Sequence, residues 1–323
     1  LENIYSSFEK KLNNFKKKKF LVAVSGGPDS LALAAFSQFY SSKIGAKFLY
    51  AHVNHNLRKN SYKESLLVKK ILERKKIKLK ILTNNKKITK NVQSQARLLR
   101  YELLARYSKS KNLNTILTAH NLEDQVETFF IRLSRGSGLT GLSSMEELTK
   151  LGKNLSLFRP FLDVKKKDLI KISKLTYGEF IIDPSNKNTK YLRTKIRSLK
   201  KPLLRSGICY DQIIKSIKNL SSSKKTLEDY LKKVFGETII RSGNKIEINL
   251  KNFNKYNTEI KMRILNESFK KISLNYYYPR SAKVLNLIKK LNYRSFKKST
   301  LGGSLIIKKK DILVLKKEKN PLI

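Results

Sequence analysis

The chain contains few of the residues that build covalent or metal frameworks. Its 323 residues include one cysteine, two methionines and no tryptophan. The single thiol, Cys209, excludes a disulfide within the chain and any four-cysteine zinc or iron–sulfur site that the chain makes alone. No apolar run approaches the roughly 18 residues that a membrane-spanning helix needs. These absences favour a reducing compartment, and we expect a soluble, cytoplasmic protein with no membrane partner.

Acidic residues are also scarce, and this scarcity sets the charge. The 71 Lys and Arg residues against 24 Asp and Glu residues give a formal net charge of +47. Two explanations stay open: a polyanionic partner such as RNA, or a compositional drift that covers every solvated face with lysine. The charge therefore supports nucleic-acid binding without proving it.

Short apolar runs alternate with longer helical ones in the first part of the chain. The pattern predicts strands at 20–24, 47–53, 78–82 and 114–118, and helices at 29–40, 62–76 and 92–111. This alternation is typical of an α/β fold with a doubly wound parallel sheet, in which ligands collect beyond the carboxyl ends of the strands. The chemically distinctive residues follow those strands.

The pattern changes after residue 204. Lysine-rich helical segments near 211–235 precede two hairpin-like pairs, at 237–250 and 299–315. We therefore predict two domains, an N-terminal catalytic domain at 1–208 and a smaller α+β domain at 209–323. The glycine-containing segment 136–160 is expected to be loop-rich and close to the site.

The segment Ser25 to Ser30 reads SGGPDS and lies between the first expected strand and the first expected helix. A strand that turns into a helix here leaves backbone N–H groups free for an anion such as phosphate. Gly26 and Gly27 allow close approach, the two serines add hydroxyl donors, and Asp29 offers a metal ligand. No lysine–serine ending follows, so this is not the Walker loop. A tight turn with a serine cap is the plain alternative.

The expected helix after the fourth strand carries two acids three residues apart, Asp124 and Glu127. This spacing places both on one helix face, where they predict a pocket for a cation. An ordinary solvated helix face is the alternative. Arg132 and Arg135 extend the same helix toward the glycine-rich segment, where phosphates are within their reach.

All three histidines, His52, His55 and His120, fall at predicted strand ends. His52 and His55 resemble a zinc pair, but their spacing at a strand end fits one face poorly and no third ligand is evident. We therefore expect them to form hydrogen bonds near a base or a phosphate.

Five separated segments, in order, are similar to those of the tRNA(Ile)-lysidine synthase family. They read SGGPDSLAL, HVNHNLR, QARLLRYELL, TAHNLEDQVETFFIRLSRGSGLTGL and DPSNKNTKYLRTKIR. The first also resembles the pyrophosphate loop (PP-loop) of the ATP pyrophosphatase superfamily. The resemblance covers roughly residues 20–205, and a weaker similarity is found in LGGSLIIKKKDILVL near the carboxyl terminus.

The resemblance implies a ligase that uses ATP and Mg to adenylate the carbonyl oxygen on carbon 2 of the wobble cytidine in tRNA(Ile) with a CAU anticodon. The side-chain amine of free L-lysine then displaces AMP, after pyrophosphate has left. The modified base pairs with A rather than G, and the tRNA accepts isoleucine rather than methionine. A homodimer is left open.

The resemblance also assigns residues to roles. ATP would be bound by Ser25, Gly26, Gly27, Pro28, Asp29, Ser30 and His52, with Asp29 also contacting magnesium. Asp29, Asp124 and Glu127 would form the catalytic set, and lysine would be bound by Arg97, Asp124 and Glu127. The tRNA would be bound by Arg132, Arg135, Arg193 and Arg197, with the domain at 209–323 helping to select it.

Two positions depart from the family pattern, because Gln93 replaces the usual glutamate and Glu123 replaces a frequent aspartate. Three other functions are alternatives to lysidine synthesis. A tRNA thiolation enzyme of the same superfamily normally needs paired cysteines or a cluster, and Cys209 is alone. A nonenzymatic RNA-binding protein would be expected to have lost the SGGPDS loop or the acids. Synthetases that make NAD or GMP share the loop but do not need so basic a surface.

Overall fold

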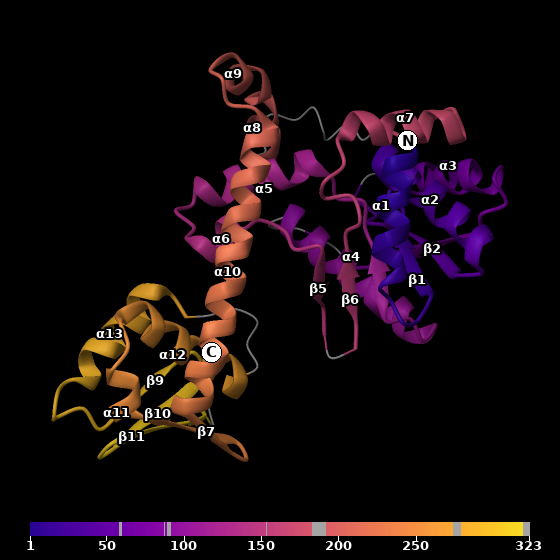
Figure 1. The fold of residues 1–323 in the computed structure, drawn as a ribbon. Helices are drawn as coiled ribbons and strands as arrows, with labels where there is room; N and C mark the ends of the chain where they lie inside the picture. The colour runs from indigo at the N-terminus through magenta and orange to yellow at the C-terminus, as the bar shows by residue number, and fades with distance from the viewer. Residues whose placement is uncertain are drawn as a thin grey trace. The chain divides into compact units, whose positions relative to one another are not determined.

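The computed structural model describes residues 1–57, 60–86, 88, 92–152, 154–182, 192–273 and 279–318. The chain divides into two compact units, Leu1–Ser221 and Ser222–Ile323. This division falls inside the long helix α10 (Tyr210–Thr238), whereas the sequence placed the boundary at 208/209, just before that helix (Figure 1). Each unit has its own sheet and its own core.

The first unit contains a six-stranded sheet in the order β3-β2-β1-β4-β6-β5. Its strands are β1 (Lys19–Ala23), β2 (Lys47–Asn54), β3 (Leu79–Thr83), β4 (Thr115–Leu117), β5 (Leu148–Lys150) and β6 (Ser156–Phe158). All neighbours are parallel except β5, which pairs antiparallel with β6 at the edge. The chain goes from β1 to β2 on one side and returns to β4 on the other. The carboxyl end of β1 is therefore the topological switch point, where such sheets bind ligands.

Nine helices belong to this unit in its described part. They are α1 (Glu2–Asn13), α2 (Pro28–Ile44), α3 (Ser61–Glu73), α4 (Val92–Ser110), α5 (Leu122–Leu133), α6 (Leu139–Leu142), α7 (Lys166–Tyr177), α8 (Leu192–Ser198) and α9 (Lys200–Arg205), followed by the start of α10. The four strands and three helices predicted from the sequence are confirmed to within a few residues. The prediction of a loop-rich segment at 136–160 was incomplete, because this segment also forms α6 and the two outer strands.

Alternating side chains of β1 explain why helices cover both faces of the sheet. Phe20 and Val22 point into a core shared with α1, α2, α3 and α7, and both are fully buried. Leu21 points the other way, into a core that includes Leu104 of α4. Side chains alternate along a strand, so a strand whose residues are all apolar is buried on both faces. The predicted doubly wound sheet is confirmed.

The second unit contains an antiparallel sheet in the order β7-β8-β11-β10-β9. Its strands are β7 (Ile239–Ser242), β8 (Lys245–Asn249), β9 (Lys298–Leu301), β10 (Ser304–Lys309) and β11 (Ile312–Lys317). Helices α11 (Leu250–Asn254), α12 (Thr258–Ser273) and α13 (Ser281–Leu291) complete it. Phe253, Ile264 and Phe269 are almost fully buried in its core.

Turn chemistry explains both the success and the error of the hairpin predictions. Gly243 and the Gly302–Gly303 pair have positive φ angles, as tight hairpin turns require. The second predicted pair, 299–315, is in fact part of a three-stranded meander. Its second turn passes through Lys310, a non-glycine residue with φ 46°, which carries no glycine signal in the sequence.

None of the described helices combines the length and the apolar character that crossing a membrane requires.

Candidate active site

The SGGPDS segment forms the predicted turn at the carboxyl end of β1. Gly26 has φ 88°, a left-handed conformation that side chains disfavour. A Cβ atom there would also lie 2.5 Å from Val68 Cγ2 and 3.3 Å from Ile181 Cδ1. Gly27 is the N-cap of α2 and has ordinary extended angles. Pro28 begins the helix, so the first-turn N–H groups that follow it point toward the strand end without intrahelical partners.

The hydroxyl of Ser30 holds this turn together. Its oxygen accepts hydrogen bonds from the backbone N–H groups of Ser25 and Gly26, each at 3.1 Å, and the hydroxyl donates to the Gly27 carbonyl at 2.9 Å. The Ser25 hydroxyl also lies 3.1 Å from it. The sequence assigned Ser30 to phosphate, whereas here its hydroxyl is used within the turn. The expected phosphate contact of Ser25 stays a prediction too, because its hydroxyl donates to Ser30 in this turn.

Asp29 connects the turn to helix α5. Its Oδ2 accepts a 3.1 Å hydrogen bond from the side-chain amide of Asn121, and Lys166 Nζ lies 3.9 Å away. Asn121 is buried and also caps α5, where its side chain accepts from the Asp124 N–H at 3.0 Å. The sequence analysis missed Asn121, although an asparagine three residues before an aspartate is a helix-start signal.

The Asp29 carboxylate has properties expected of a metal ligand. Its Oδ1 is buried and has no hydrogen-bond partner among the described residues. Burial raises its pKa to about 6, while Lys166 lowers it and Asp124 raises it. No group of three metal-ligating side chains gathers within the described residues. A magnesium ion held by one carboxylate and by substrate phosphates fits this arrangement, because Mg²⁺ commonly binds proteins through one or two carboxylates.

The predicted pair Asp124 and Glu127 lies on one face of α5, but guanidinium groups of α8 already occupy it. Arg193 donates to Asp124 Oδ1 at 2.7 Å and to Glu127 Oε2 at 2.6 Å. Arg197 donates to the two Glu127 oxygens at 2.7 and 3.0 Å. The sequence assigned these arginines to the tRNA backbone and these acids to lysine. In this arrangement they bind one another instead.

The two acids differ in their freedom to bind a further cation. The Glu127 side chain is 2% exposed. Burial raises the pKa of this carboxyl, but the hydrogen bonds from Arg197 and Arg193 have the larger effect, so the pKa is lowered overall. The Asp124 side chain is 18% exposed. Burial raises its pKa, partly offset by Arg193. Asp124 is thus the more accessible of the two, and Glu127 is saturated.

The three histidines lie near the site but carry no charge at neutral pH. Burial lowers the pKa of His52, although a 2.8 Å hydrogen bond from its Nδ1 to the Val24 carbonyl opposes this. Burial and Arg100 lower the pKa of His55 to about 4. Burial, then Arg159 and other arginines, lower that of His120 well below its ordinary value. They are therefore suited to hydrogen bonding, as predicted, and not to charge neutralisation.

The remaining predicted arginines have different surroundings. Arg132 donates from one Nη to the carbonyls of Gly141 and Ser144, both at 2.7 Å, and so fastens the glycine-rich segment to α5. This contact gives Arg132 a structural role, and its expected phosphate contact stays a prediction. Arg135 is exposed. Arg97 lies on α4, with its guanidinium 5.3 Å from the ring centre of Tyr101.

Glu123 lies on a different face of α5 from Asp124 and Glu127, in agreement with the helical spacing. Its carboxylate accepts from the Lys166 N–H at 2.8 Å, at the start of α7, and lies 3.3 Å from Lys200 Nζ of α9. It therefore ties α5 to two other helices. The last residue of the segment HVNHNLR and residues 183–191, which begin the segment DPSNKNTKYLRTKIR, lie outside the described residues, as does the side chain of Gln93.

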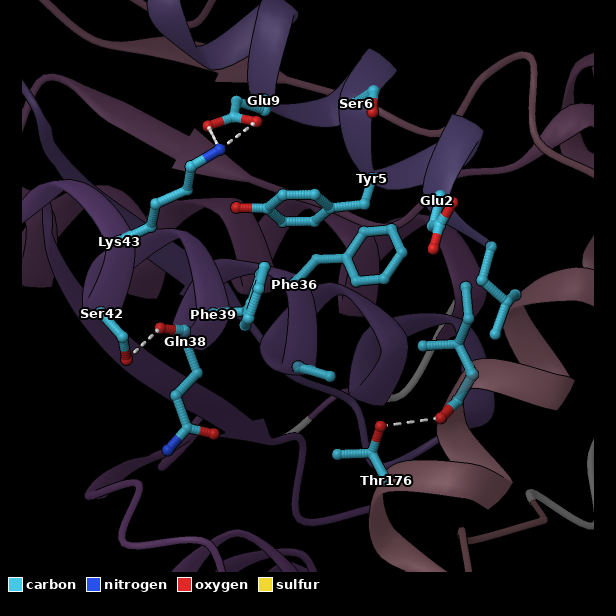
Figure 2. Close-up of a pocket in the computed structure, with 13 residues that line it drawn as sticks. Glu2, Tyr5, Ser6, Glu9, Phe36, Gln38, Phe39, Ser42, Lys43 and Thr176 are labelled. Atoms are coloured by element: carbon cyan, nitrogen blue, oxygen red, sulfur yellow. Dashed lines mark hydrogen bonds and ion pairs between the residues drawn. The ribbon is translucent and has the colours of Figure 1, made fainter.

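A cavity of about 800 Å³ opens elsewhere, among α1, the second half of α2 and α7 (Figure 2). Tyr5, Phe36 and Phe39 pack edge to face in it, and Lys43 pairs with Glu9 at 2.8 Å. It contains none of the predicted site residues. The candidate active site is therefore the strand-end cluster and not this cavity.

Comparison with known proteins agrees with this assignment. Residues 1–203 match the family model described as the PP-loop domain. Fold and site thus define a PP-loop protein, an α/β domain with a glycine turn at the carboxyl end of β1.

Curated relatives narrow the class. The chain is 34% identical over 299 residues to the tRNA(Ile)-lysidine synthase of Wolbachia pipientis wMel, covering 91% of this chain and 69% of that one. It is 30% identical over 330 residues to that of Rickettsia typhi, covering 98% and 74%. The relative from Orientia tsutsugamushi is 40% identical over 189 residues, covering 58% and 42%. The chain belongs to the tRNA(Ile)-lysidine synthase family.

A solved structure supports the fold. The U34-tRNA thiolase NcsA from Methanococcus maripaludis, with its [4Fe-4S] cluster, aligns with a TM-score of 0.57 over 68% of this chain and 78% of that one. At 18% identity this likeness concerns the fold alone.

The geometry of the turn predicts unequal effects of two neighbouring substitutions. Gly26→Ala adds backbone strain of about 1–2 kcal/mol and overpacking of about 1–3 kcal/mol, so it should destabilise the first unit by about 2–5 kcal/mol. Gly27→Ala has space and ordinary angles, and as an N-cap change it should cost at most about 1 kcal/mol. Urea titration with hydrogen exchange of first-unit peptides measures both. Equal losses would contradict the assigned geometry.

Proposed function

We propose that this protein is an ATP-dependent ligase that joins free L-lysine to carbon 2 of the wobble cytidine of tRNA(Ile) with a CAU anticodon, releasing AMP and pyrophosphate. The observation that carries the proposal is the Asn121–Asp29 hydrogen bond, because Asn121 also caps the helix of Asp124 and so joins the turn proposed for phosphate to this carboxylate. One position for ATP and one for an amine, side by side, is what adenylation followed by amine attack requires.

The turn residues would hold the ATP. The N-terminus of α2 offers N–H groups and a favourable dipole to the phosphates, and Ser25 adds a hydroxyl. A magnesium ion on Asp29 would supply charge neutralisation for those phosphates. Lys166, near Asp29, adds a positive charge on the same side, where negative charge accumulates as pyrophosphate leaves.

Asp124 would bind the α-ammonium group of lysine. This leaves the side-chain amine free to lose its proton and to attack the activated carbon. Glu127 is already bound by Arg193 and Arg197, so lysine can reach it only if α8 withdraws. Glu127 would then position α8, and Asp124 would make the substrate contact beside Arg193, which already donates to its Oδ1.

The tRNA would be bound by the basic surface, including Arg135 and, as predicted from the sequence, the second unit. The charge of +47 is consistent with a polyanionic substrate. The other functions find less support. The relatives reported above are named as lysidine synthases, and the chain has one cysteine where thiolation chemistry normally uses a pair or a cluster.

The direct test is to incubate the protein with ATP, magnesium, labelled lysine and tRNA(Ile). We expect label in the RNA, linked to the base and dependent on ATP, together with AMP. The same tRNA with a GAU anticodon is the matched control and should stay unlabelled. Release of AMP without lysine incorporation would point to a different nucleophile and would refute the proposal.

Replacing Asp124 separates lysine binding from ATP binding. Asp124→Asn should raise the KM for lysine about 10–100-fold, because a charge-assisted contact is lost, while the KM for ATP changes less than about 3-fold. Glu123→Gln, on the same helix but facing α7 and α9, is the control and should leave the lysine KM within about 3-fold. An unchanged lysine KM for Asp124→Asn would remove the assigned role.

Replacing Asp29 tests the proposed binding of magnesium and of the ATP phosphates. Asp29→Ala should lower AMP formation by about 10²–10³-fold, since it removes the carboxylate proposed to hold magnesium. The affinity for tRNA, measured by filter binding, should stay within about 2-fold because Asp29 is largely buried. A variant that forms AMP at the normal rate would show that the metal and phosphates bind elsewhere.

A further inference from the structure

Glu127 receives more hydrogen bonds from guanidinium groups than its pairing requires. Arg197 alone makes a two-point contact, with its Nε 2.7 Å from Glu127 Oε1 and its Nη2 3.0 Å from Oε2. Arg193 adds a third bond, from its Nε to Oε2 at 2.6 Å. A two-point contact between a guanidinium group and a carboxylate is already a strong, directional pair. The buried Glu127 carboxylate therefore keeps a complete partner even when Arg193 moves away.

Arg193 also occupies the one oxygen of Asp124 that is left for a substrate. Asp124 Oδ2 accepts from the Asn121 N–H at 3.1 Å, as part of the cap of α5. Asp124 Oδ1 accepts from Arg193 Nη2 at 2.7 Å. The Arg193 side chain is 37% exposed, so solvent and large ligands can reach it. The bond between Arg193 and Asp124 Oδ1 is thus the accessible part of this network, and the Arg197–Glu127 pair is its fixed part.

An ammonium ion that binds Asp124 would meet the guanidinium group of Arg193 at the same oxygen. Burial raises the pKa of Asp124, and Arg193 has the largest opposing effect. This opposing effect shows that the positive charge of Arg193 already compensates the Asp124 carboxylate. Two cations at one carboxylate oxygen repel each other, so the ammonium ion and Arg193 compete for Asp124.

We propose that Arg193 exchanges partners when the substrates bind: the α-ammonium group of the amino acid displaces it from Asp124, and the released guanidinium group binds a phosphate of the tRNA backbone. This inference rests on the function proposed above and concerns the order and coupling of its two binding events. Lysine frees Arg193 for the tRNA, and a tRNA phosphate that holds Arg193 frees Asp124 for lysine. The two substrates therefore bind with positive coupling, which is reciprocal by thermodynamic necessity.

A phosphate is the partner that the released guanidinium group fits. Guanidinium groups bind phosphates as they bind carboxylates, through paired hydrogen bonds. The chain has 71 Lys and Arg residues against 24 Asp and Glu residues, so a released arginine finds few free carboxylates on the protein itself. Arg197 keeps α8 attached to α5 during the exchange. Only the side chain of Arg193 has to move, and the helix does not withdraw.

The test measures the affinity for tRNA(Ile) by filter binding, with magnesium and a nonhydrolysable ATP analogue, in the absence and in the presence of saturating L-lysine. Lysine should tighten tRNA binding to the wild-type protein about 5–50-fold. It should also steepen the plot of log affinity against log salt concentration by about 0.7–0.9, because one more phosphate is contacted.

Arg193→Gln removes the group that exchanges partners. Without tRNA, this variant should bind lysine about 3–10-fold more tightly than the wild-type protein in calorimetry, because the competitor for Asp124 is absent. Its affinity for tRNA should change less than about 2-fold when lysine is added. Arg193→Lys keeps a cation at this position and should retain a coupling of at least about 3-fold, which separates the exchange from a loss of local structure.

Arg135→Gln is the matched control, because Arg135 is an exposed arginine of the same unit that lies just after α5. It should keep the full coupling, whatever its effect on tRNA affinity. Three results would overturn the exchange. They are a wild-type tRNA affinity that does not respond to lysine, an intact coupling in Arg193→Gln, and weaker lysine binding by both Arg193 variants. The last result would make Arg193 part of the lysine site instead of a competitor for it.

These measurements use no turnover, so the exchange and the proposed reaction can fail separately. A protein that shows the coupling through Arg193 but does not transfer lysine to tRNA with ATP would keep the exchange and refute the reaction. A protein that transfers lysine to tRNA but binds the two substrates independently would do the reverse.

Discussion

The hydrogen bond from Asn121 to Asp29 is the interaction on which the site depends. It joins the start of α2, which follows β1, to the start of α5, which follows β4. Because β1 and β4 are neighbours in the sheet, the positive ends of both helix dipoles point to the same region. Asn121 serves two purposes there, since it caps α5 and orients the Asp29 carboxylate. The turn proposed to bind phosphate and the Asp124 carboxylate are adjacent for this reason.

Charge is distributed unevenly in a chain with 71 basic and 24 acidic residues. At the site, acids and bases are closely matched: Glu127 binds two arginines, and Glu123 lies between the start of α7 and Lys200 of α9. Arg97 and Arg100 lie against the Tyr101 ring instead. The guanidinium groups of this unit thus have two kinds of surroundings, carboxylates in one case and an aromatic ring in the other.

Much of the fold was predictable, because its signals are local. The alternation of β1, the glycine pair after it and the periodicity of α2 and α4 each depend on residues close in sequence. The outer strands β5 and β6 have only three residues each, too few for a pattern to show. The turn at Lys310 was missed since a lysine with positive φ has no compositional signal.

The sequence indicated which residues of the candidate site lie together, but not which contacts they make. Asp29, Asp124 and Glu127 do gather at neighbouring strand ends, as their positions indicated. Sequence reasoning could not show that the Ser30 hydroxyl is used inside the turn, or that Arg132 holds two carbonyls.

The sequence by itself therefore determined the alternation of the first four strands with their helices, the glycine-containing turn after β1 and the face that Asp124 and Glu127 share. All of these follow from backbone preferences and from periodicity over a few residues. Only the tertiary structure decided which charges meet, as Arg193 with Glu127 across 66 residues and Asn121 with Asp29 across 92. The partner of a side chain is set by the packing of distant elements, and no local pattern encodes that choice.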